Sequence, residues 1–533
     1  MGLLEVLTDC TESSPGPRLR HLADPALPGA AECTRGDKSC SVWVNVDFIQ
    51  VYMKFSTSRY TVMTSVITVP LHQKLLLGAV ALGTIMDGLD GSIVNVALPT
   101  IAADFDTDIG TIAWVIITYL LMMAGFLLVF GKIADRGLMK MIFISGFIIF
   151  TLASAACGLS PALPILLASR IVQGIGAAMI AAVAPLLCVR YLPPRMLGIA
   201  LGVLTAANSI GFAAGPAIGG ILTHYLSWHW IFLINIPIGI IGILFASRVI
   251  PTDHPIEDKT PFDFAGVATL FGAVVSGIFV LEEVAALGIT DPLILVCATL
   301  CVLFASLFII RELKTPTPLI NIRVFGTWQF TSVLTAFLLI NVVYMGVLYL
   351  LPFYLTAEME FSMATSGMYL LIPPAITALL GITFGRLSDR YGRRGFVVAA
   401  CLVIIVFNCI FATYVPEAGV VPLLFALVLM GAAFGIAGGP ASSKIIECAP
   451  EGEEGTGSSL MITTVYLGGV LGTALYATIF TFITASDGLV SFTDLDSATF
   501  LAGFHVTISI GLILSVLSLV LSAIVRDDDR HAL

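Results

Sequence analysis

The chain has 533 residues, of which 58% are hydrophobic and only 11% charged, and its mean hydropathy is +1.01. Soluble globular proteins carry about 25% charged residues, and no soluble fold of this length could cover so much apolar surface with polar side chains. The formal net charge of −10 comes with no basic patch, so we expect no nucleic-acid partner. The apolar residues lie in stretches of about 20, the length of helix that crosses a bilayer. The composition therefore predicts a polytopic α-helical membrane protein.

The first 71 residues differ from the rest of the chain because they are polar, irregular and mixed in charge, with no secretory signal pattern. Only Val42–Phe55 shows some alternation of apolar and polar residues. Met63 lies just before the first apolar run, which leaves two interpretations open. Residues 1–62 are either a cytoplasmic extension, with or without fixed structure, or the product of an over-extended gene start.

From Leu75 on, fourteen apolar runs follow one another, with glycine and proline inside them, as is common in membrane helices. The expected spans are 75–98, 112–131, 141–159, 163–187, 198–223, 229–248, 263–284, 292–311, 328–355, 366–386, 395–414, 421–446, 457–484 and 500–525. The ten cysteines form no CxxC pair and no metal-ligand spacing, so we expect no metal and no cofactor.

The positions of the basic residues test the number of spans. Beyond Lys74, every Lys and Arg except Arg170 follows an even-numbered run, whereas the segments after odd-numbered runs carry acids and no Lys or Arg. A miscounted span would have scrambled this pattern. By the positive-inside rule, the even side is cytoplasmic and so are both termini.

A repeat indicates how the spans are grouped. The segment Gly131–Arg136 after the second run resembles Gly385–Arg394 after the tenth, an offset of eight spans. Two six-helix halves repeated in parallel would give an offset of six, so the seventh and eighth spans look inserted between the halves. The expected divisions are an N-terminal extension 1–71, a first six-helix half 72–250, two extra spans with their linkers 251–323, a second six-helix half 324–526 and a tail 527–533.

Five segments carry a resemblance to a known family. They are Leu89–Pro99 in the first run, Gly131–Arg136 after the second, Arg170–Ala178 in the fourth, Gly211–Gly220 in the fifth and Trp228–Pro237 at the start of the sixth. In this order they resemble the major facilitator superfamily, specifically its fourteen-spanner drug–proton antiporter branch (the EmrB/QacA type), over about residues 72–526. The resemblance implies an all-α membrane fold of two six-helix halves plus two inserted helices. The first loop departs from the family, which usually has glycine where Leu138 stands and a base where Met139 stands.

Two acids lie inside the first span. Asp87 and Asp90 are three residues apart and share a helix face. A charge at mid-bilayer costs roughly 2.5–3.5 kcal/mol or more, so such residues usually face a cavity or a partner. Burial and mutual repulsion favour protonation of one of them near neutral pH. We expect proton coupling there, against the alternative that one acid merely orients the helix.

Arg170 stays charged at any pH and must be paired or wetted inside the fourth span. Its depth is similar to that of Asp90, which makes a salt bridge feasible and leaves Asp87 as the titrating acid. The family resemblance assigns Arg170 to proton coupling, and a purely structural ion pair is the alternative.

The glycines of the fifth span are four residues apart and form one smooth stripe (Gly211, Gly215 and Gly219). Pro216 should bend this helix, and Gly220 ends the motif. We expect the stripe to pack tightly on the other half and to limit leak, and the resemblance makes it an antiporter motif.

The two repeated loops are expected to act as cytoplasmic latches that break and re-form as the halves rock. Their residues are Gly131, Asp135, Arg136, Gly385, Asp389 and Arg390. Glu282 and Glu283, at the outer end of the seventh span, are expected to be a solvated helix end. The aromatic residues of the ninth span are expected to be mostly core or lipid-facing, with a few lining a drug cavity (Tyr344, Tyr349, Phe353 and Tyr354).

Three classes of function compete. The first is proton-driven efflux of small lipophilic or cationic compounds by alternating access, working as a monomer in the plasma membrane with the substrate, protons and lipid as its partners. The second is a proton-coupled metabolite importer or exporter of the same fold, and the exporter-type fifth-span motif disfavours import. The third is a membrane enzyme or receptor, for which the sequence offers no nucleophile motif and no soluble catalytic domain. No Walker-type loop occurs, so ATP is not the direct energy source.

Overall fold

A computed structural model describes residues 31–33, 39–46, 49–56, 70–193, 196–253, 263–315, 318, 320–413, 419–450, 453–484 and 491–525. The chain forms two compact units, Met1–Ser65 and Val66–Leu533. Met63 and the tail 527–533 lie outside the described residues, so both interpretations of the chain start stay open.

The first unit contains a small antiparallel sheet. Strands β1 (Ala31–Cys33), β2 (Ser39–Val46) and β3 (Ile49–Ser56) are ordered β1-β2-β3. In the register of the longer pair, Trp43 lies opposite Tyr52. The alternation noticed at Val42–Phe55 therefore falls on β2 and β3, because strands expose successive residues on opposite faces.

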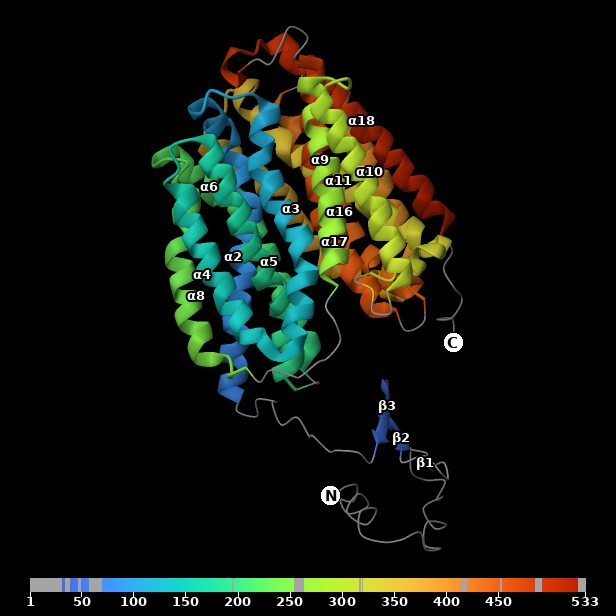
Figure 1. The fold of residues 1–533 in the computed structure, drawn as a ribbon. Helices are drawn as coiled ribbons and strands as arrows, with labels where there is room; N and C mark the ends of the chain where they lie inside the picture. The colour runs from blue at the N-terminus through green and yellow to red at the C-terminus, as the bar shows by residue number, and fades with distance from the viewer. Residues whose placement is uncertain are drawn as a thin grey trace, which may run out of the picture. The chain divides into compact units, whose positions relative to one another are not determined.

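The second unit is helical across its described residues (Figure 1). Its longer helices are α2 (Pro70–Asp104), α3 (Ile109–Ile133), α4 (Met139–Gly158), α5 (Leu163–Tyr191), α6 (Leu197–Tyr225), α8 (Asn235–Val249), α9 (Phe264–Leu287), α10 (Pro292–Lys314), α11 (Trp328–Ala357), α13 (Ile372–Tyr391), α14 (Arg394–Thr413), α16 (Val420–Cys448), α17 (Glu454–Thr484) and α18 (Ser497–Ile524). Shorter elements are the π-helical turn η2 (Ala134–Leu138), α7 (Trp230–Leu233), the 3₁₀ turns η4 (Ile322–Gly326) and η5 (Phe492–Asp494), and α12 (Met363–Leu370).

Fourteen helices in the described part of the chain are long and apolar enough to cross a membrane, one for each predicted span. Two of these spans are broken into consecutive helices, α7–α8 and α12–α13. Each break precedes proline, at Pro237 and at Pro373, where the missing N–H interrupts the helical hydrogen bonds. The predicted all-α membrane fold is confirmed for the helical unit.

The packing of helix against helix repeats along the chain. In the first six spans, α2 packs on α6, α3 and α4 on α5, and α4 on α8. In the last six, α11 packs on α17, α13 and α14 on α16, and α14 on α18. Each pair maps onto its counterpart by the offset of eight spans seen in the repeated loops. We propose on this ground that the spans form two six-helix halves, divided as the sequence predicts.

The halves meet along a few helix pairs: α3 with α17, α6 with α12 and α13, and α2 with α11. The inserted pair lies beside them. Helix α9 packs on α10, on α3 of the first half and on α17 of the second, whereas α10 packs on α9 and η4. In the most apolar stretch of each of these two helices only 11% is buried, so most of the surface of α9 and α10 is left for lipid.

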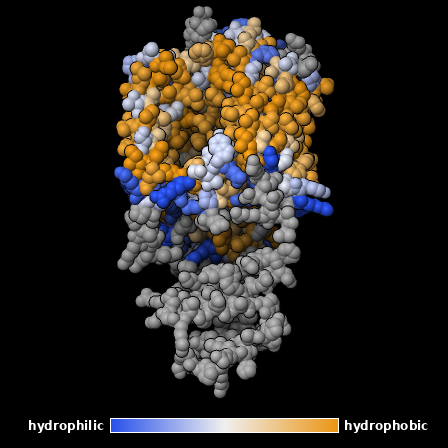
Figure 2. Space-filling view, turned by 90° about the vertical axis from the view of Figure 1, so that its right-hand side faces the viewer, coloured by the Kyte–Doolittle hydropathy of each residue, from blue (hydrophilic) through white to orange (hydrophobic). Residues whose placement is uncertain are grey.

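The helices of the bundle end at two opposite faces. The lower face of Figure 1 is the one at which α2 begins, and the upper face is the one at which α2 ends. Hydrophobic residues cover the body between them, while hydrophilic residues gather in a band along its lower edge (Figure 2). Large exposed apolar side chains such as Leu152 and Ile221 belong to this body, as expected for a surface in contact with lipid.

Candidate functional site

Asp90 lies on α2 in a fully buried ion pair. One carboxylate oxygen accepts from Nη1 of Arg170 on α5 at 2.7 Å, and the two side chains are 0% and 1% exposed. The other oxygen accepts from the amide nitrogens of Gln173 at 2.8 Å and Asn235 at 2.9 Å. Every partner belongs to the first half. The charge of Asp90 is thus neutralised and its oxygens are all bonded, which is the condition for keeping an ion pair out of water.

The guanidinium of Arg170 is held on several sides. Its Nε donates to the carbonyl of Val115 at 2.9 Å and its Nη1 to Oε1 of Gln173 at 2.6 Å. The ring of Tyr119 lies 4.1 Å from the guanidinium carbon, within cation–π range. Gln173 also donates to the hydroxyl of Ser154 at 2.9 Å. These contacts fix α2, α3, α4 and α5 to one another around a single charge.

Asp87 lies one turn earlier on α2 and has a different environment. It is 9% exposed, and its hydrogen-bond partners among the described residues are neutral donors: Tyr119 at 3.3 Å, Asn208 at 3.4 Å and Tyr466 at 3.4 Å. Tyr119 and Asn208 belong to the first half, but Tyr466 is on α17 of the second. Among the described residues, no Lys or Arg is within ion-pair distance of Asp87. This carboxyl therefore lies at the seam between the halves without a counter-ion.

The sequence identified the acids and the arginine of this site but not all of their partners. Gln173 and Asn235 lie inside the motifs quoted above, so their presence near the site had a signal. Tyr119, Asn208 and Tyr466 had none, because all three lie outside those motifs. Their role depends on which helix faces which.

The glycine stripe of α6 packs mainly within its own half, which corrects the expectation that it faces the other half. A Cβ at Gly211 would lie 2.2 Å from the carbonyl of Ile85, and one at Gly215 would lie 2.9 Å from the amide of Ile93, both on α2. Positions four apart share a helix face, and α2 occupies that face.

Gly220 faces the other half. A Cβ at this residue would lie 2.4 Å from the carbonyl of Met363 on α12, and Gly367 of α12 in turn approaches the carbonyl of Pro216. Residue 220 is one step, about 100°, around the helix from the stripe. The tight contact between halves therefore depends on Gly220 and Gly367, one on each side.

The two repeated loops each turn at a glycine, but at different places. Gly137 has φ +86° inside η2, and Gly392 has φ +91° after α13. The first turn comes two residues after Asp135 and the second three residues after Asp389. A positive φ is costly for leucine, so this loop turns at Gly137 and not at Leu138, where the family usually has its glycine.

The latch role of the loops stays a prediction. The side chains of Asp135 and Asp389 lie outside the described residues, and Arg390 lies 5.5 Å from the ring of Tyr391. A Cβ added at Gly131 would meet no described atom within 4 Å. Gly385 lies close to α16, because a Cβ added at Gly439 of that helix would lie 3.3 Å from the Cα of Gly385.

Other bonds fix the lower ends of the helices within each half. Asp253 lies in the linker just after the first half, and both of its oxygens accept from the backbone at the start of α4, from the N–H groups of Lys140 and Met141 at 2.8 Å each. In the second half, Glu447 pairs with Arg393 at 3.1 Å and with Lys444 at 3.3 Å. Beside each repeated loop, an acidic side chain thus links two neighbouring segments of the chain.

Glu282 and Glu283 contradict the expectation of a solvated helix end. Glu282 is 6% exposed and neither of its oxygens has a hydrogen-bond partner among the described residues. Glu283 accepts from the indole of Trp114 at 3.0 Å. The expectation failed because it placed the end of α9 in water, whereas α3 and α17 cover it.

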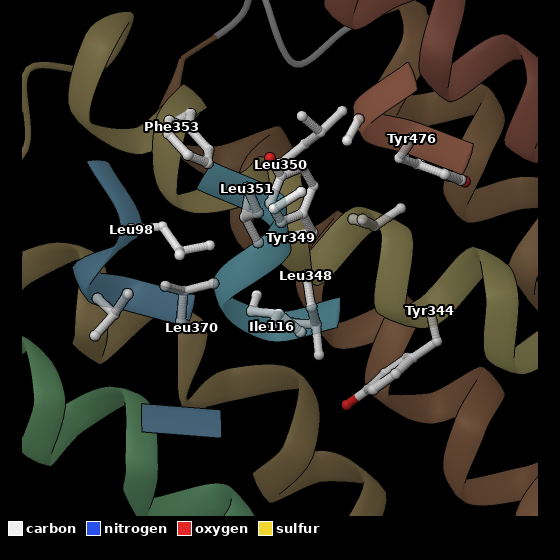
Figure 3. Packing of buried hydrophobic residues seen from close by; sticks show 14 of the residues in the cluster. Leu98, Ile116, Tyr344, Leu348, Tyr349, Leu350, Leu351, Phe353, Leu370 and Tyr476 are labelled. Carbon is white, nitrogen blue, oxygen red and sulfur yellow. The ribbon is translucent and has the colours of Figure 1, made fainter. Parts of the chain in front are cut away.

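The aromatic residues of α11 are core residues. Tyr344 stacks on Phe434 with ring centroids 4.2 Å apart, Tyr349 donates to the carbonyl of Ile109, and Tyr354 stacks on Phe504. Figure 3 shows Tyr349 among Leu98 and Ile116 of the first half and leucines of α11. This cluster seals the halves together toward the upper face.

Loop contacts continue the seal above the cluster. The amide of Phe492 donates to the carbonyl of Thr107 at 3.3 Å, and the hydroxyl of Ser491 donates to Asp106 at 2.8 Å. The structure thus represents a state closed at the upper face.

A family model matches residues 80–473, and its description is Major Facilitator Superfamily. The chain belongs to this superfamily and is a multi-pass membrane protein of a transporter family. The predicted assignment to the fourteen-spanner drug–proton antiporter branch is confirmed by this match together with the relatives below.

Curated relatives carry several names. The riboflavin transporter RibZ of Clostridioides difficile is 31% identical over 406 residues, covering 76% of this chain and 88% of that protein. The multidrug resistance protein B homolog of Mycobacterium tuberculosis is 28% identical, covering 76% of each chain. The tetracenomycin C resistance and export protein of Streptomyces glaucescens is 30% identical, covering 74% of each.

Solved structures agree on the fold. A bacterial homologue of the human lysosomal transporter Spinster, in an inward-facing and unoccupied conformation, superposes with a TM-score of 0.61 at 15% identity, covering 85% of this chain and 98% of that one. The nucleoside transporter NupG superposes with a TM-score of 0.60 at 13% identity, covering 85% of this chain and all of that one.

Proposed function

We propose that this chain exports small lipophilic or cationic compounds in exchange for protons, by alternating access, as a monomer in the plasma membrane. The observation that carries the proposal is the contrast between Asp90, held in an ion pair, and Asp87, buried at the seam between the halves and bonded, among the described residues, to neutral groups only. A proton-driven exporter needs a group that is charged in one state and neutral in another. Asp87 meets this requirement without leaving an unpaired arginine behind.

The position of Asp87 links protonation to movement. Tyr466 reaches this carboxyl from the second half, whereas Tyr119 and Asn208 reach it from the first. When the halves rock, the bond to Tyr466 must lengthen or re-form, because its two ends belong to different halves. The proton affinity of Asp87 therefore differs between the two states, and that difference couples the proton gradient to transport.

Export of drug-like compounds is supported by two of the relatives, whose names describe multidrug resistance and tetracenomycin export. The tight contact between the halves at Gly220 and Gly367 is consistent with an exporter that limits leak. Export is therefore the direction we propose.

A second candidate is a proton-coupled transporter of one metabolite on the same fold. The riboflavin transporter is as similar to this chain as the drug-resistance relatives are, so sequence identity does not separate the two functions. The two candidates share the coupling site and differ in the substrate.

The test uses energised inverted vesicles and a panel of lipophilic cations, neutral drugs and flavins. We expect uphill uptake of several unrelated lipophilic compounds, abolished by a protonophore. Asp87→Asn should lose uphill transport and keep substrate binding and downhill exchange. The matched control is Asp291→Asn, the same change at a carboxyl on the α9–α10 turn that accepts from the backbone N–H of Leu293 and from no other described residue, and it should leave uphill transport intact.

Two outcomes would contradict the proposal. Normal uphill pumping with unchanged pH dependence in both Asp87→Asn and Asp90→Asn would remove the coupling site from this helix. Uptake of a flavin alone from the panel would favour the metabolite transporter.

We also propose that the lower face is cytoplasmic, with both termini on that side. The hydrophilic band along the lower edge and the even-side Lys and Arg residues support this orientation (Figure 2). Cysteines introduced at Thr107 and Ser491 should react with an impermeant thiol reagent added outside intact cells, and one at Gly137 should not. Labelling of position 137 from outside would overturn the orientation.

A further inference from the structure

Glu282 is a buried carboxyl that the coupling site does not use. It lies near the upper end of α9, is 6% exposed, and has no hydrogen-bond partner for either oxygen among the described residues. The hydroxyl of Thr478 faces it from α17 but donates to the carbonyls of Leu281 at 2.6 Å and Ala474 at 2.7 Å. Two backbone carbonyls thus compete with Glu282 for the one hydroxyl proton, so Thr478 is a weak donor to this carboxyl.

No cation among the described residues is within ion-pair distance of this carboxyl. The titratable groups around Glu282 are Glu283 on α9 itself, Asp108 at the start of α3 and Tyr349 on α11. Helix α10 adds Asp291 at the same end of the hairpin. In sequence, the segments that join the helices at this face contain no Lys or Arg. An ionised carboxylate here would be a buried charge among other acids, which is strongly unfavourable.

The place of Glu282 in the fold connects it to the closure of the upper face. Its neighbour Glu283 is bonded to Trp114 of the first half, and its neighbour Leu281 to Thr478 of the second. Helix α9 thus bridges α3 and α17 at the level of Glu282. If the halves part at the upper face, at least one of these two bonds must break, and the cover over Glu282 opens with it.

We propose that Glu282 is a second proton-binding site, an outer latch that must be protonated before the outer side can close. In the closed state the carboxyl is neutral because, among the described residues, no cation or strong donor stabilises its charge. In the open state it meets water, which stabilises the ionised carboxylate. The outer latch exchanges its proton with the outer medium only, so it adds pH dependence to closure without adding a transported proton.

The inference rests on the alternating access of the proposed function but on neither its substrate nor Asp87. Protons arriving from outside would favour closure, which is the step that a proton-driven exporter needs after releasing its substrate outside. The inserted helix pair would then serve as a sensor of external pH attached to the seam between the halves.

The experiment measures outer opening in the Asp87→Asn background, so that titration of Asp87 does not contribute. Leu98→Cys reports opening, since Leu98 is fully buried in the seal of Figure 3. An impermeant thiol reagent is added outside cells with internal pH clamped, while external pH is varied. Each labelling rate of Leu98→Cys is divided by the labelling rate of Thr290→Cys, on the exposed α9–α10 turn, which removes the pH dependence of the thiol reaction itself. The Asp87→Asn protein without an added cysteine is the blank.

With Glu282 present, we expect the normalised rate to rise with external pH, by at most about tenfold per pH unit because one proton is linked to opening. Glu282→Gln, which mimics the protonated form, should hold the rate at its low-pH value throughout. Glu283→Gln makes the same charge change on the next residue and should keep the pH dependence. Glu282→Leu is the second neutral variant if the glutamine variant is not produced in the membrane.

Two results would overturn the outer latch: a rate that does not change with external pH while Glu282 is present, or a pH dependence that survives in both neutral variants. Uphill pumping by Asp87→Asn would instead contradict the proposed coupling site and leave the outer latch standing. The two proposals therefore fail separately.

Discussion

Asp87 and Asp90 are one helical turn apart on α2, and their surroundings are opposite. Asp90 is bonded to Arg170, Gln173 and Asn235, all within the first half. Asp87 has three longer bonds to neutral groups, one of them from the second half. The same residue type on one face of one helix thus serves as a fixed structural charge in one place and as a candidate proton carrier in the other.

This contrast between the two acids shows where a titrating group can be placed in a membrane protein. A charge that is fully paired inside a rigid half has no reason to change with conformation. A carboxyl at the seam between two moving halves changes its contacts whenever they move, so its proton affinity follows the conformation. The paired acid holds the half together, and the unpaired one can respond to movement.

The largest effect should come from breaking the ion pair. Arg170→Ala leaves Asp90 buried without its counter-ion, which should destabilise the protein by about 3–5 kcal/mol. We expect a collapse in the yield of monodisperse protein in detergent, together with loss of transport. Adding Asp90→Asn should recover yield but not transport. Normal yield of the single variant would show that the pair does not hold the half together.

A smaller contrast should appear between the two acids themselves. Asp90→Asn leaves the Arg170 charge unbalanced and should lower the thermal unfolding temperature markedly. Asp87→Asn removes no ion pair and should change stability by no more than about 1 kcal/mol, since only neutral hydrogen bonds are altered. Thermal unfolding of the two purified variants checks this, and equal losses would erase the distinction between the acids.

The smallest effect should come from the bond between the halves. Tyr466→Phe removes one hydroxyl donor to Asp87, a change of about 0.5–1.5 kcal/mol. Stability should fall by no more than this amount, and the pH profile of transport should move, because a hydroxyl donor stabilises the ionised carboxylate more than the neutral acid. Thr463→Val is the matched control, since it removes a hydroxyl that donates within α17, to the carbonyl of Ser459 at 2.9 Å. An unmoved profile in Tyr466→Phe would separate Tyr466 from coupling.

Much of the fold could be predicted from the sequence. Span length follows from bilayer thickness, so the apolar runs alone predict fourteen helices. The loop repeat predicts the offset of eight spans that the packing pairs obey. The ion pair of Asp90 and Arg170 could also be predicted, because counting residues from the ends of each span gives the two side chains similar depths in the membrane.

The partners across helices needed the tertiary structure. The direction in which a residue points around its helix, and which neighbour occupies that side, depends on the packing of the whole bundle. The glycine stripe of α6 therefore faces α2 rather than the other half, and Gly220 makes the contact that was expected of the stripe.

The number of spans and the charges that lie inside them follow from the sequence alone, because length, hydropathy and charge are properties of each segment. Only the tertiary structure decided that Tyr466 reaches Asp87 from the second half and that Glu282 is enclosed rather than solvated. Both depend on contacts between segments far apart in the chain, and a membrane helix carries no polar and apolar face pattern strong enough to reveal such contacts, because lipid and protein neighbours are both apolar.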